Sequence, residues 1–101
     1  MKIIHSIPDE WENIAQLFIA LGDAHRQRIL LAFEKGERMN ILQIVAASTL
    51  SRTAVTHHLK LLHQCGALQS EKKGKEVYYW VNKSFMTQAI NNVLRYIETE
   101  I

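Results

Sequence analysis

Residues 50–83 constrain the fold more than any other part of the chain, because they combine a capped amphipathic helix, a glycine stop and a basic hairpin. Ser51 is a favourable N-cap, since its hydroxyl can accept a hydrogen bond from a free amide of the first turn. Gly66 can end the helix, because glycine adopts the left-handed conformation at no steric cost. An apolar stripe at helical spacing predicts that this helix packs on a core. The residues of the stripe are Val55, Leu59 and Leu62, with Ala54 and His58 alongside.

The opposite face of this helix is polar and positively charged. Its side chains are short or cationic, and all of them can form hydrogen bonds. The major groove of DNA is wide enough to admit one α-helix, so a face of this kind suits base recognition. The alternative interpretation is a solvated amphipathic helix without a partner. The residues of this polar face are Arg52, Thr53, Thr56, His57 and Lys60.

A two-stranded hairpin is expected over residues 67–82, because polar and apolar residues alternate on both sides of a short turn. Gly74 permits a tight turn. Three lysines beside it would repel one another without an anionic partner, and phosphates supply one. An ordinary solvated turn is the alternative. The turn lysines are Lys72, Lys73 and Lys75, and the alternating residues are Leu68, Ser70, Val77, Tyr79 and Val81.

Positive charge is concentrated in this part of the chain. Residues 50–83 contain six Lys and Arg against two Glu, a net charge of +4, whereas the whole chain carries +2. The remaining residues therefore carry −2. A basic helix and hairpin on an otherwise acidic chain are the charge pattern expected of a nucleic-acid-binding surface.

The length of 101 residues suits one small domain, and a chain that is 48% hydrophobic is expected to fold and not to be disordered. No apolar run approaches the roughly 18 residues that span a bilayer. The N-terminus lacks the pattern of a secretory signal, and the single cysteine, Cys65, cannot form an internal disulfide. We therefore expect a cytoplasmic protein without membrane association, in which Cys65 is a small packed residue.

Enzymatic activity has no support in the sequence. Lys73-Gly74-Lys75 lacks the spacing of a phosphate-binding loop. No grouping of Ser, His and an acid, or of Cys and His, stands out in the sequence. A binding module is the expected class.

Three further helices are expected before the basic stretch. Pro8 precedes the first, over residues 9–21, and Asp23 can cap the second, which Lys35-Gly36-Glu37 closes. Asn40 and Gln43 fit a capping box at the start of a short third helix. A brief turn then leads to Ser51, so residues 40–65 form a helix-turn-helix.

A final helix is expected over residues 84–101, with Ser84 as its N-cap. Its apolar surface exceeds what a terminal helix needs to cover a small core, and a patch of this kind usually marks a partner surface. Pairing with the first helix of a second copy would bury it in a two-fold dimer, unless both faces pack within one subunit. The expected interface residues are Trp11, Ile14, Phe18, Met86, Ile90, Val93, Leu94 and Ile97.

The ordered elements resemble the ArsR/SmtB family of winged-helix repressors. The resemblance covers roughly residues 14–82 and rests on ALGDAHRQRILLAFEKGE, TAVTHHLKLLHQCGAL and KKGKEVYYWV in that order. It implies a mainly α fold with a small β-hairpin (α+β), in the order of four helices, two strands and a helix. It also implies a homodimeric bacterial repressor that binds a palindromic operator on double-stranded DNA, with the hairpin as a wing and the terminal helices as the dimer contact.

The two metal sites of that family are absent from this chain. One uses Cys-x-Cys near the start of the third helix, after Gly-Glu, but Gly36-Glu37 is followed by Arg38, Met39, Asn40 and Ile41. The other uses Asp, His and Glu on the last helix, which here contains neither His nor Asp. The five histidines also have poor ligand spacing, since adjacent His57 and His58 point about 100° apart on a helix. We expect no metal and no cofactor, with His58 turned toward the core.

Each DNA-binding candidate has an expected role. Arg can bind guanine in a bidentate manner, and Thr offers a hydroxyl and a methyl group to thymine, so Arg52, Thr53, Thr56 and His57 are candidates for base edges. Ser51, Lys60, Lys72, Lys73 and Lys75 are candidates for phosphates, and Asn40 joins the DNA-binding set.

Two questions stay open at this point. An effector, if there is one, is a small organic molecule near Trp11, Phe18 and Tyr96. The alternative function is a winged-helix protein-interaction module that acts on another regulator and binds no operator of its own. The basic hairpin argues against that alternative, because such a module needs no phosphate contacts.

Overall fold

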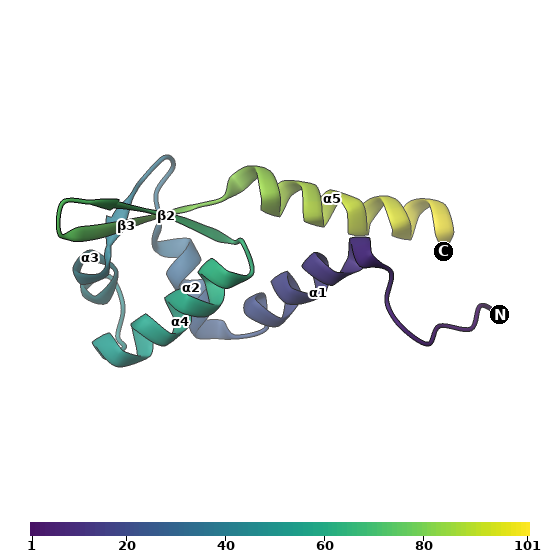
Figure 1. Cartoon of the computed structure of the whole chain (residues 1–101), viewed down its shortest axis with the longest axis horizontal. Coiled ribbons are helices and arrows are strands. Elements are labelled where there is room, and N and C mark those ends of the chain that lie inside the picture. The colour runs from purple at the N-terminus through teal and green to yellow at the C-terminus, as the bar shows by residue number, and fades with distance from the viewer.

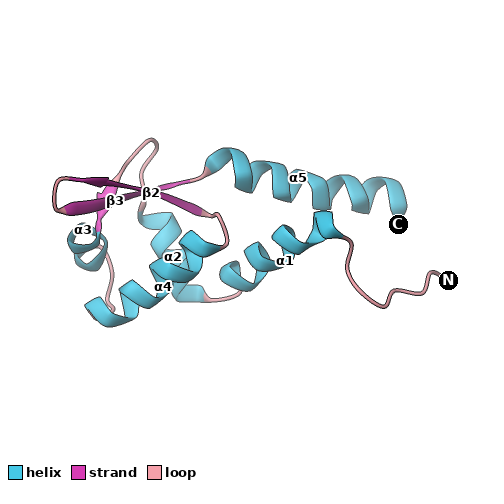
Figure 2. Ribbon diagram, viewed as in Figure 1, coloured by secondary structure: helices cyan, strands magenta, loops and turns pink.

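The computed structural model describes all residues, 1–101, as five helices and a three-stranded sheet (Figures 1 and 2). The molecule is elongated, 52 × 24 × 21 Å. The β2–β3 hairpin lies at one end, and α5 and the N-terminus extend to the other (Figure 1). The predicted order of elements is confirmed. The elements are α1 (Asp9–Leu21), α2 (Ala24–Ala32), β1 (Met39–Asn40), α3 (Ile41–Ala46), α4 (Arg52–Gln64), β2 (Leu68–Lys73), β3 (Glu76–Val81) and α5 (Lys83–Glu100).

The helix-turn-helix formed by α3 and α4 begins and ends where its capping residues predict. The Asn40 side chain accepts a hydrogen bond from the Gln43 amide at 2.9 Å, and the Gln43 side chain accepts one from the Asn40 amide, also at 2.9 Å. The Ser51 hydroxyl accepts from the Ala54 amide at 3.2 Å. Gly66 follows α4 with φ +92°, a value that favours glycine. Local capping therefore sets both ends of α4.

Strands β2 and β3 form the predicted hairpin, with Leu68 opposite Val81 and Lys73 opposite Glu76. Gly74 has φ +62° in the turn between them. The sequence gives no signal for β1, whose residue Met39 pairs with Tyr79 on the other edge of β3. Two residues are too few to show an alternating pattern, so only the pairing with β3 identifies them as a strand.

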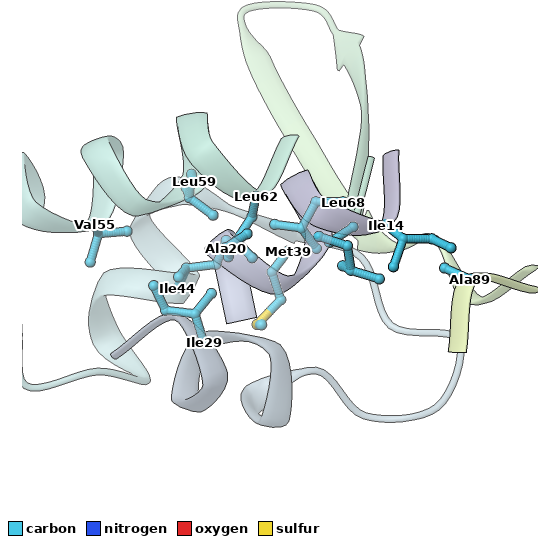
Figure 3. Close-up of a cluster of buried hydrophobic side chains, with 12 residues drawn as sticks. Ile14, Ala20, Ile29, Met39, Ile44, Val55, Leu59, Leu62, Leu68 and Ala89 are labelled. Atoms are coloured by element: carbon cyan, nitrogen blue, oxygen red, sulfur yellow. The ribbon is translucent and has the colours of Figure 1, made fainter. Parts of the chain in front are cut away.

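The core lies where the buried faces of α1, α3 and α4 meet β2. Leu17, Val55 and Leu62 have no exposed surface, and Leu59 is 2% exposed. The predicted stripe on α4 is therefore confirmed, and Figure 3 shows Val55, Leu59 and Leu62 side by side along that helix. The whole core cluster consists of Ile14, Leu17, Ala20, Ile29, Met39, Ile44, Val55, Leu59, Leu62, Ala67, Leu68 and Ala89.

Two predicted helix boundaries were wrong. The N-cap of α5 is Asn82, whose side chain accepts from the Phe85 amide at 3.4 Å. Ser84 does not cap the helix, because it lies within the first turn, and its hydroxyl donates to the Asn82 side chain at 3.3 Å. Helix α2 ends at Ala32, because Phe33 already has extended backbone angles. Asn82 can cap α5 directly after β3, so no linker separates the hairpin from the last helix.

None of the helices combines the length and the apolar character that crossing a bilayer requires.

We predict that Leu62→Ala lowers the free energy of unfolding by about 2–5 kcal/mol, because it opens a cavity in a fully packed core. Leu42→Ala is the matched control, since Leu42 on α3 is 58% exposed. It should change the stability by less than about 0.5 kcal/mol. Urea unfolding measures both variants. Equal losses would show that the α4 stripe is not the main stabilising contact.

Candidate nucleic-acid interface

The polar face of α4 lies on the surface, with its backbone anchored by the buried stripe on the other side. All five predicted side chains are exposed. The Thr56 hydroxyl donates to the Arg52 carbonyl at 2.8 Å, which leaves its oxygen as an acceptor and its methyl group as an apolar contact. The face therefore offers an arginine, a lysine, two threonines and a histidine at helical spacing. The five residues are Arg52, Thr53, Thr56, His57 and Lys60.

The hairpin turn carries three exposed lysines without ion pairs. The two glutamates of the hairpin are occupied by other groups. Glu71 pairs with Arg38 at 2.9 Å. Glu76 accepts hydrogen bonds from the Tyr78 hydroxyl at 2.8 Å and from the Asn40 side chain at 3.3 Å, and the Tyr78 contact raises the pKa of that phenol. The positive charge of the turn therefore remains available to an anionic partner. The lysines are Lys72, Lys73 and Lys75.

Two of the predicted DNA-binding residues, Asn40 and Ser51, use their side chains to cap helices. The Asn40 side chain uses its oxygen in the capping box and its amide toward Glu76. The Ser51 hydroxyl is engaged in capping α4. Both lie next to the exposed face of the helix-turn-helix, and both side chains already hold polar partners.

Arg26 joins three helices, a role that its position in the sequence did not reveal. Its guanidinium donates to the Ala20 carbonyl at 2.6 Å and to the Ile19 carbonyl at 3.3 Å, at the end of α1. It also donates to Nδ1 of His58 on α4 at 3.3 Å and lies 3.7 Å from the carboxylate of Asp23. One side chain therefore donates to two carbonyls in the last turn of α1 and links α2, on which it lies, to α4.

His58 is half-buried beside this arginine, which agrees with the expectation that it turns toward the core. Burial lowers its pKa, and the positive charge of Arg26 adds to that effect, while Asp23 opposes it. For Asp23 itself, burial acts to raise the pKa, but hydrogen bonds from two backbone amides and the charge of Arg26 lower it overall. The His58 ring also lies 5.9 Å from the His25 ring and 5.7 Å from the His57 ring. The Arg26 guanidinium can only donate, so this contact favours the neutral His58 ring with Nδ1 as the hydrogen-bond acceptor.

The terminal helices pack on each other and leave an apolar surface. The rings of Trp11 and Tyr96 meet edge to face, with centroids 5.2 Å apart. Four predicted interface residues remain between 44% and 50% exposed, namely Phe18, Ile90, Leu94 and Ile97. Trp11, Met86 and Val93 are partly buried against the core.

Ile14 departs from the rest of the predicted interface set. It is 5% exposed and belongs to the core of the single chain. Its spacing on α1 matches that of Trp11 and Phe18, so the pattern alone could not separate a core position from a surface position.

No group of three or more His, Cys, Asp or Glu side chains is arranged to hold a metal ion. The Cys65 thiol donates to the Leu62 carbonyl at 3.3 Å and is half-buried. A groove of about 290 Å³ lies between α1 and α5, beside Trp11 and Tyr96, the region expected to bind an organic effector if the protein has one. Phe18 does not line it.

Lowering the pH below 6.5 should reduce the free energy of unfolding. The unfolded chain then binds a proton at His58 that the folded chain resists, because the folded pKa is lowered. Above pH 6.5 the side chain is neutral in both states, so the stability is fully present there and is lost as the pH falls. Urea unfolding at about pH 7.5 and about pH 5.5 measures the difference.

The variant His58→Gln should flatten this dependence. His57→Gln is the control on the same helix, and it should retain the dependence because His58 is intact. If both variants retain it equally, the lowered pKa of His58 does not cause the loss of stability at low pH.

Comparison with known proteins agrees with this geometry. The sequence model of the family described as bacterial regulatory protein, arsR family, matches residues 23–70 of this chain. The transcriptional repressor SdpR of Bacillus subtilis is 30% identical over 81 residues, which cover 80% of this chain and 89% of SdpR.

Two solved structures share the fold. An ArsR-like transcriptional regulator from Rhodococcus sp. RHA1 has a TM-score of 0.80 and 27% identity, covering 89% of this chain and 83% of that one. The homodimeric winged helix-turn-helix DNA-binding domain of Mb0332 from Mycobacterium bovis has a TM-score of 0.69 and 18% identity, covering 95% and 93%. The chain belongs to the ArsR/SmtB family of winged helix-turn-helix proteins, which are DNA-binding transcription regulators and not enzymes.

Proposed function

We propose that this chain is a dimeric repressor that binds a palindromic operator and does not sense metal. The observation that carries the proposal is that α4 and the lysine turn both carry exposed, positively charged side chains. Val55, Leu59 and Leu62 anchor α4 in the core, and Leu68 anchors the start of the hairpin. Sequence-specific binding requires cations for the phosphates and hydrogen-bonding side chains for the base edges, and these two elements supply both.

The two parts of this surface have different roles in the proposal. Helix α4 enters the major groove, where Arg52, Thr53, Thr56 and His57 contact base edges. The lysine turn contacts the phosphate backbone beside it, together with Lys60 and the capped N-terminus of α4 at Ser51. Phosphate contacts set the register of the protein on the duplex, and base contacts select the sequence. Asn40 supports the helix-turn-helix from its capping box.

A second copy provides the other half of the reading surface. Two α4 helices related by a two-fold axis would contact half-sites about 34–36 Å apart, one turn of the duplex. The exposed apolar residues of α1 and α5 supply the contact between copies, and the homodimeric relative from Mycobacterium bovis supports this arrangement. Ile14 is left out of the contact because it is buried in the single chain. A dimer that occupies a promoter blocks transcription, and the repressor SdpR supports that outcome.

Indifference to metal follows from the residues at the two family sites. Residues 38–41, where the first site would have its Cys-x-Cys pair, contain no cysteine, and α5 carries only glutamates as potential ligands. The α1–α5 groove near Trp11 and Tyr96 would lie beside the dimer contact, where an organic effector could act on the pairing of the two copies. Such a regulator works on chromosomal DNA, so we propose a cytoplasmic location.

We predict that Arg52→Ala and Lys73→Ala weaken DNA binding in different ways. Arg52→Ala should reduce discrimination between operator and random duplex by about 1–3 kcal/mol, because it removes a base contact. Lys73→Ala should weaken binding to both duplexes about equally and reduce the salt slope by about one per phosphate contact. Fluorescence anisotropy titrations over a range of salt concentrations measure both quantities.

Lys2→Ala is the matched control, because it removes the same charge at the end of the molecule opposite the hairpin (Figure 1). It should leave both affinities nearly unchanged. The assignment of roles fails if Arg52→Ala and Lys73→Ala have the same effect on both duplexes. Absence of binding to any duplex at low salt would favour a protein-interaction module.

We further predict that Leu94→Glu converts the dimer to a monomer, because a buried unpaired carboxylate is strongly unfavourable. Leu94 is 50% exposed on α5. Leu31→Glu is the control, since Leu31 on α2 is 81% exposed and lies outside the proposed contact. Sedimentation velocity reports the oligomeric state. A monomeric parent protein, or equal dissociation of both variants, would refute the proposed interface.

A further inference from the structure

A small recess lies between α2 and the turn that joins α3 to α4, apart from the α1–α5 groove. Its volume is about 100 Å³, and five of its nine lining residues are hydrophobic. Ile29 and Ile44, which are 2% and 1% exposed, belong to both the recess and the core. Figure 3 shows these two side chains facing each other between their helices. The inner wall is therefore apolar and held in place by the packing of the core.

The rim of the recess is polar and positively charged. Arg28 donates to Nδ1 of His25 at 2.6 Å, and both residues line the recess. Thr49, on the opposite side, is exposed and adds a hydroxyl. No Asp or Glu lines the recess, so the arginine has no carboxylate partner there. The planar guanidinium of Arg28 matches a carboxylate in geometry.

We propose that this recess binds a small carboxylate with a short apolar tail. The tail would lie against Ile29 and Ile44, and the carboxylate would accept hydrogen bonds from Arg28 and Thr49 at the rim. A cavity of about 150 Å³ holds benzene, so about 100 Å³ accommodates roughly four carbon-sized atoms. A chain of three or four carbons with its carboxylate at the rim fits that size. A backbone phosphate of DNA fits less well, because it has no apolar group for the inner wall.

The ligand would contact α2 on one side and, on the other, the turn between α3 and α4 that sets the position of α4. The Ser48 hydroxyl, also in the lining, accepts from the Leu50 amide at 3.1 Å and donates to the Val45 carbonyl at 3.4 Å. These hydrogen bonds order the turn two residues before α4 begins at Arg52. A ligand that ties this turn to α2 through Arg28 would change how freely α4 can adjust to the duplex. That consequence rests on the proposed function, whereas binding itself does not.

Amide NMR spectra recorded during a titration with sodium butyrate test the proposal without DNA. Sodium chloride keeps the ionic strength constant, and the butyrate concentration reaches about 100 mM, well above the dissociation constant on the order of 1 mM expected for a ligand of this size. The expected result is saturable shifts at Ile29 and at residues 48–50. Butyramide, which lacks the charge, should bind at least about tenfold more weakly. Absence of saturable shifts, or equal binding of butyramide, would overturn the proposal.

Two variants and a control locate the site. Arg28→Gln should weaken butyrate binding at least about tenfold, since it removes the charged partner. Ala47→Leu should block binding by filling the recess, because Ala47 is one of its lining residues. Arg95→Gln on α5 removes an equal charge far along the chain and should bind as the parent does. Butyrate shifts that persist unchanged in Arg28→Gln or in Ala47→Leu would place the ligand elsewhere and refute the assignment.

A final titration connects the recess to DNA. Saturating butyrate should change the affinity for the operator duplex several-fold in the parent protein and not in Ala47→Leu. If the parent binds no duplex, the proposed function fails, while the NMR titration still decides on the recess. If butyrate produces no shifts but Arg28→Gln weakens duplex binding, Arg28 is a phosphate contact and the carboxylate site does not exist.

Discussion

The burial of one face of α4 is the constraint on which the rest of the structure depends. Val55, Leu59 and Leu62 lose nearly all of their surface to the core. At about 25 cal/mol per Å² of apolar surface, burying such a side chain contributes roughly 1.5–3 kcal/mol. This packing fixes the rotation of the helix about its axis. The opposite face, which carries the cations and hydroxyls, must then face away from the core.

Polar contacts determine where α4 begins and how it is joined to the neighbouring helices. Ser51 caps the N-terminus of α4, and Arg26 joins its middle to the carbonyl end of α1 through His58. The glutamates of the hairpin are held by Arg38, Tyr78 and Asn40. None of these contacts involves a lysine of the turn. The basic surface thus results from two features together, the sorting of apolar and polar residues on α4 and the pairing of Glu71 with Arg38 instead of with a turn lysine.

Features encoded locally could be predicted, and features made by tertiary contacts could not. The stripe on α4, the capping box at Asn40 and the glycine turns depend on residues a few positions apart, so their patterns are visible in the chain. Strand β1 exists only because Met39 and Asn40 pair with β3. The contact of Arg26 with His58 spans 32 positions, and no periodicity indicates it. The burial of Ile14 likewise depends on which face of α1 meets the core.

The central claim is that the basic surface of α4 and the lysine turn recognises a specific DNA sequence. The most direct measurement is a fluorescence anisotropy titration of the protein on a duplex taken from upstream of its own gene, against a scrambled duplex of equal composition. Each titration is repeated with zinc and with a chelator. The account predicts tighter, salt-sensitive binding to the natural duplex, unchanged by zinc. Equal affinity for both duplexes, or release of DNA by zinc, would contradict it.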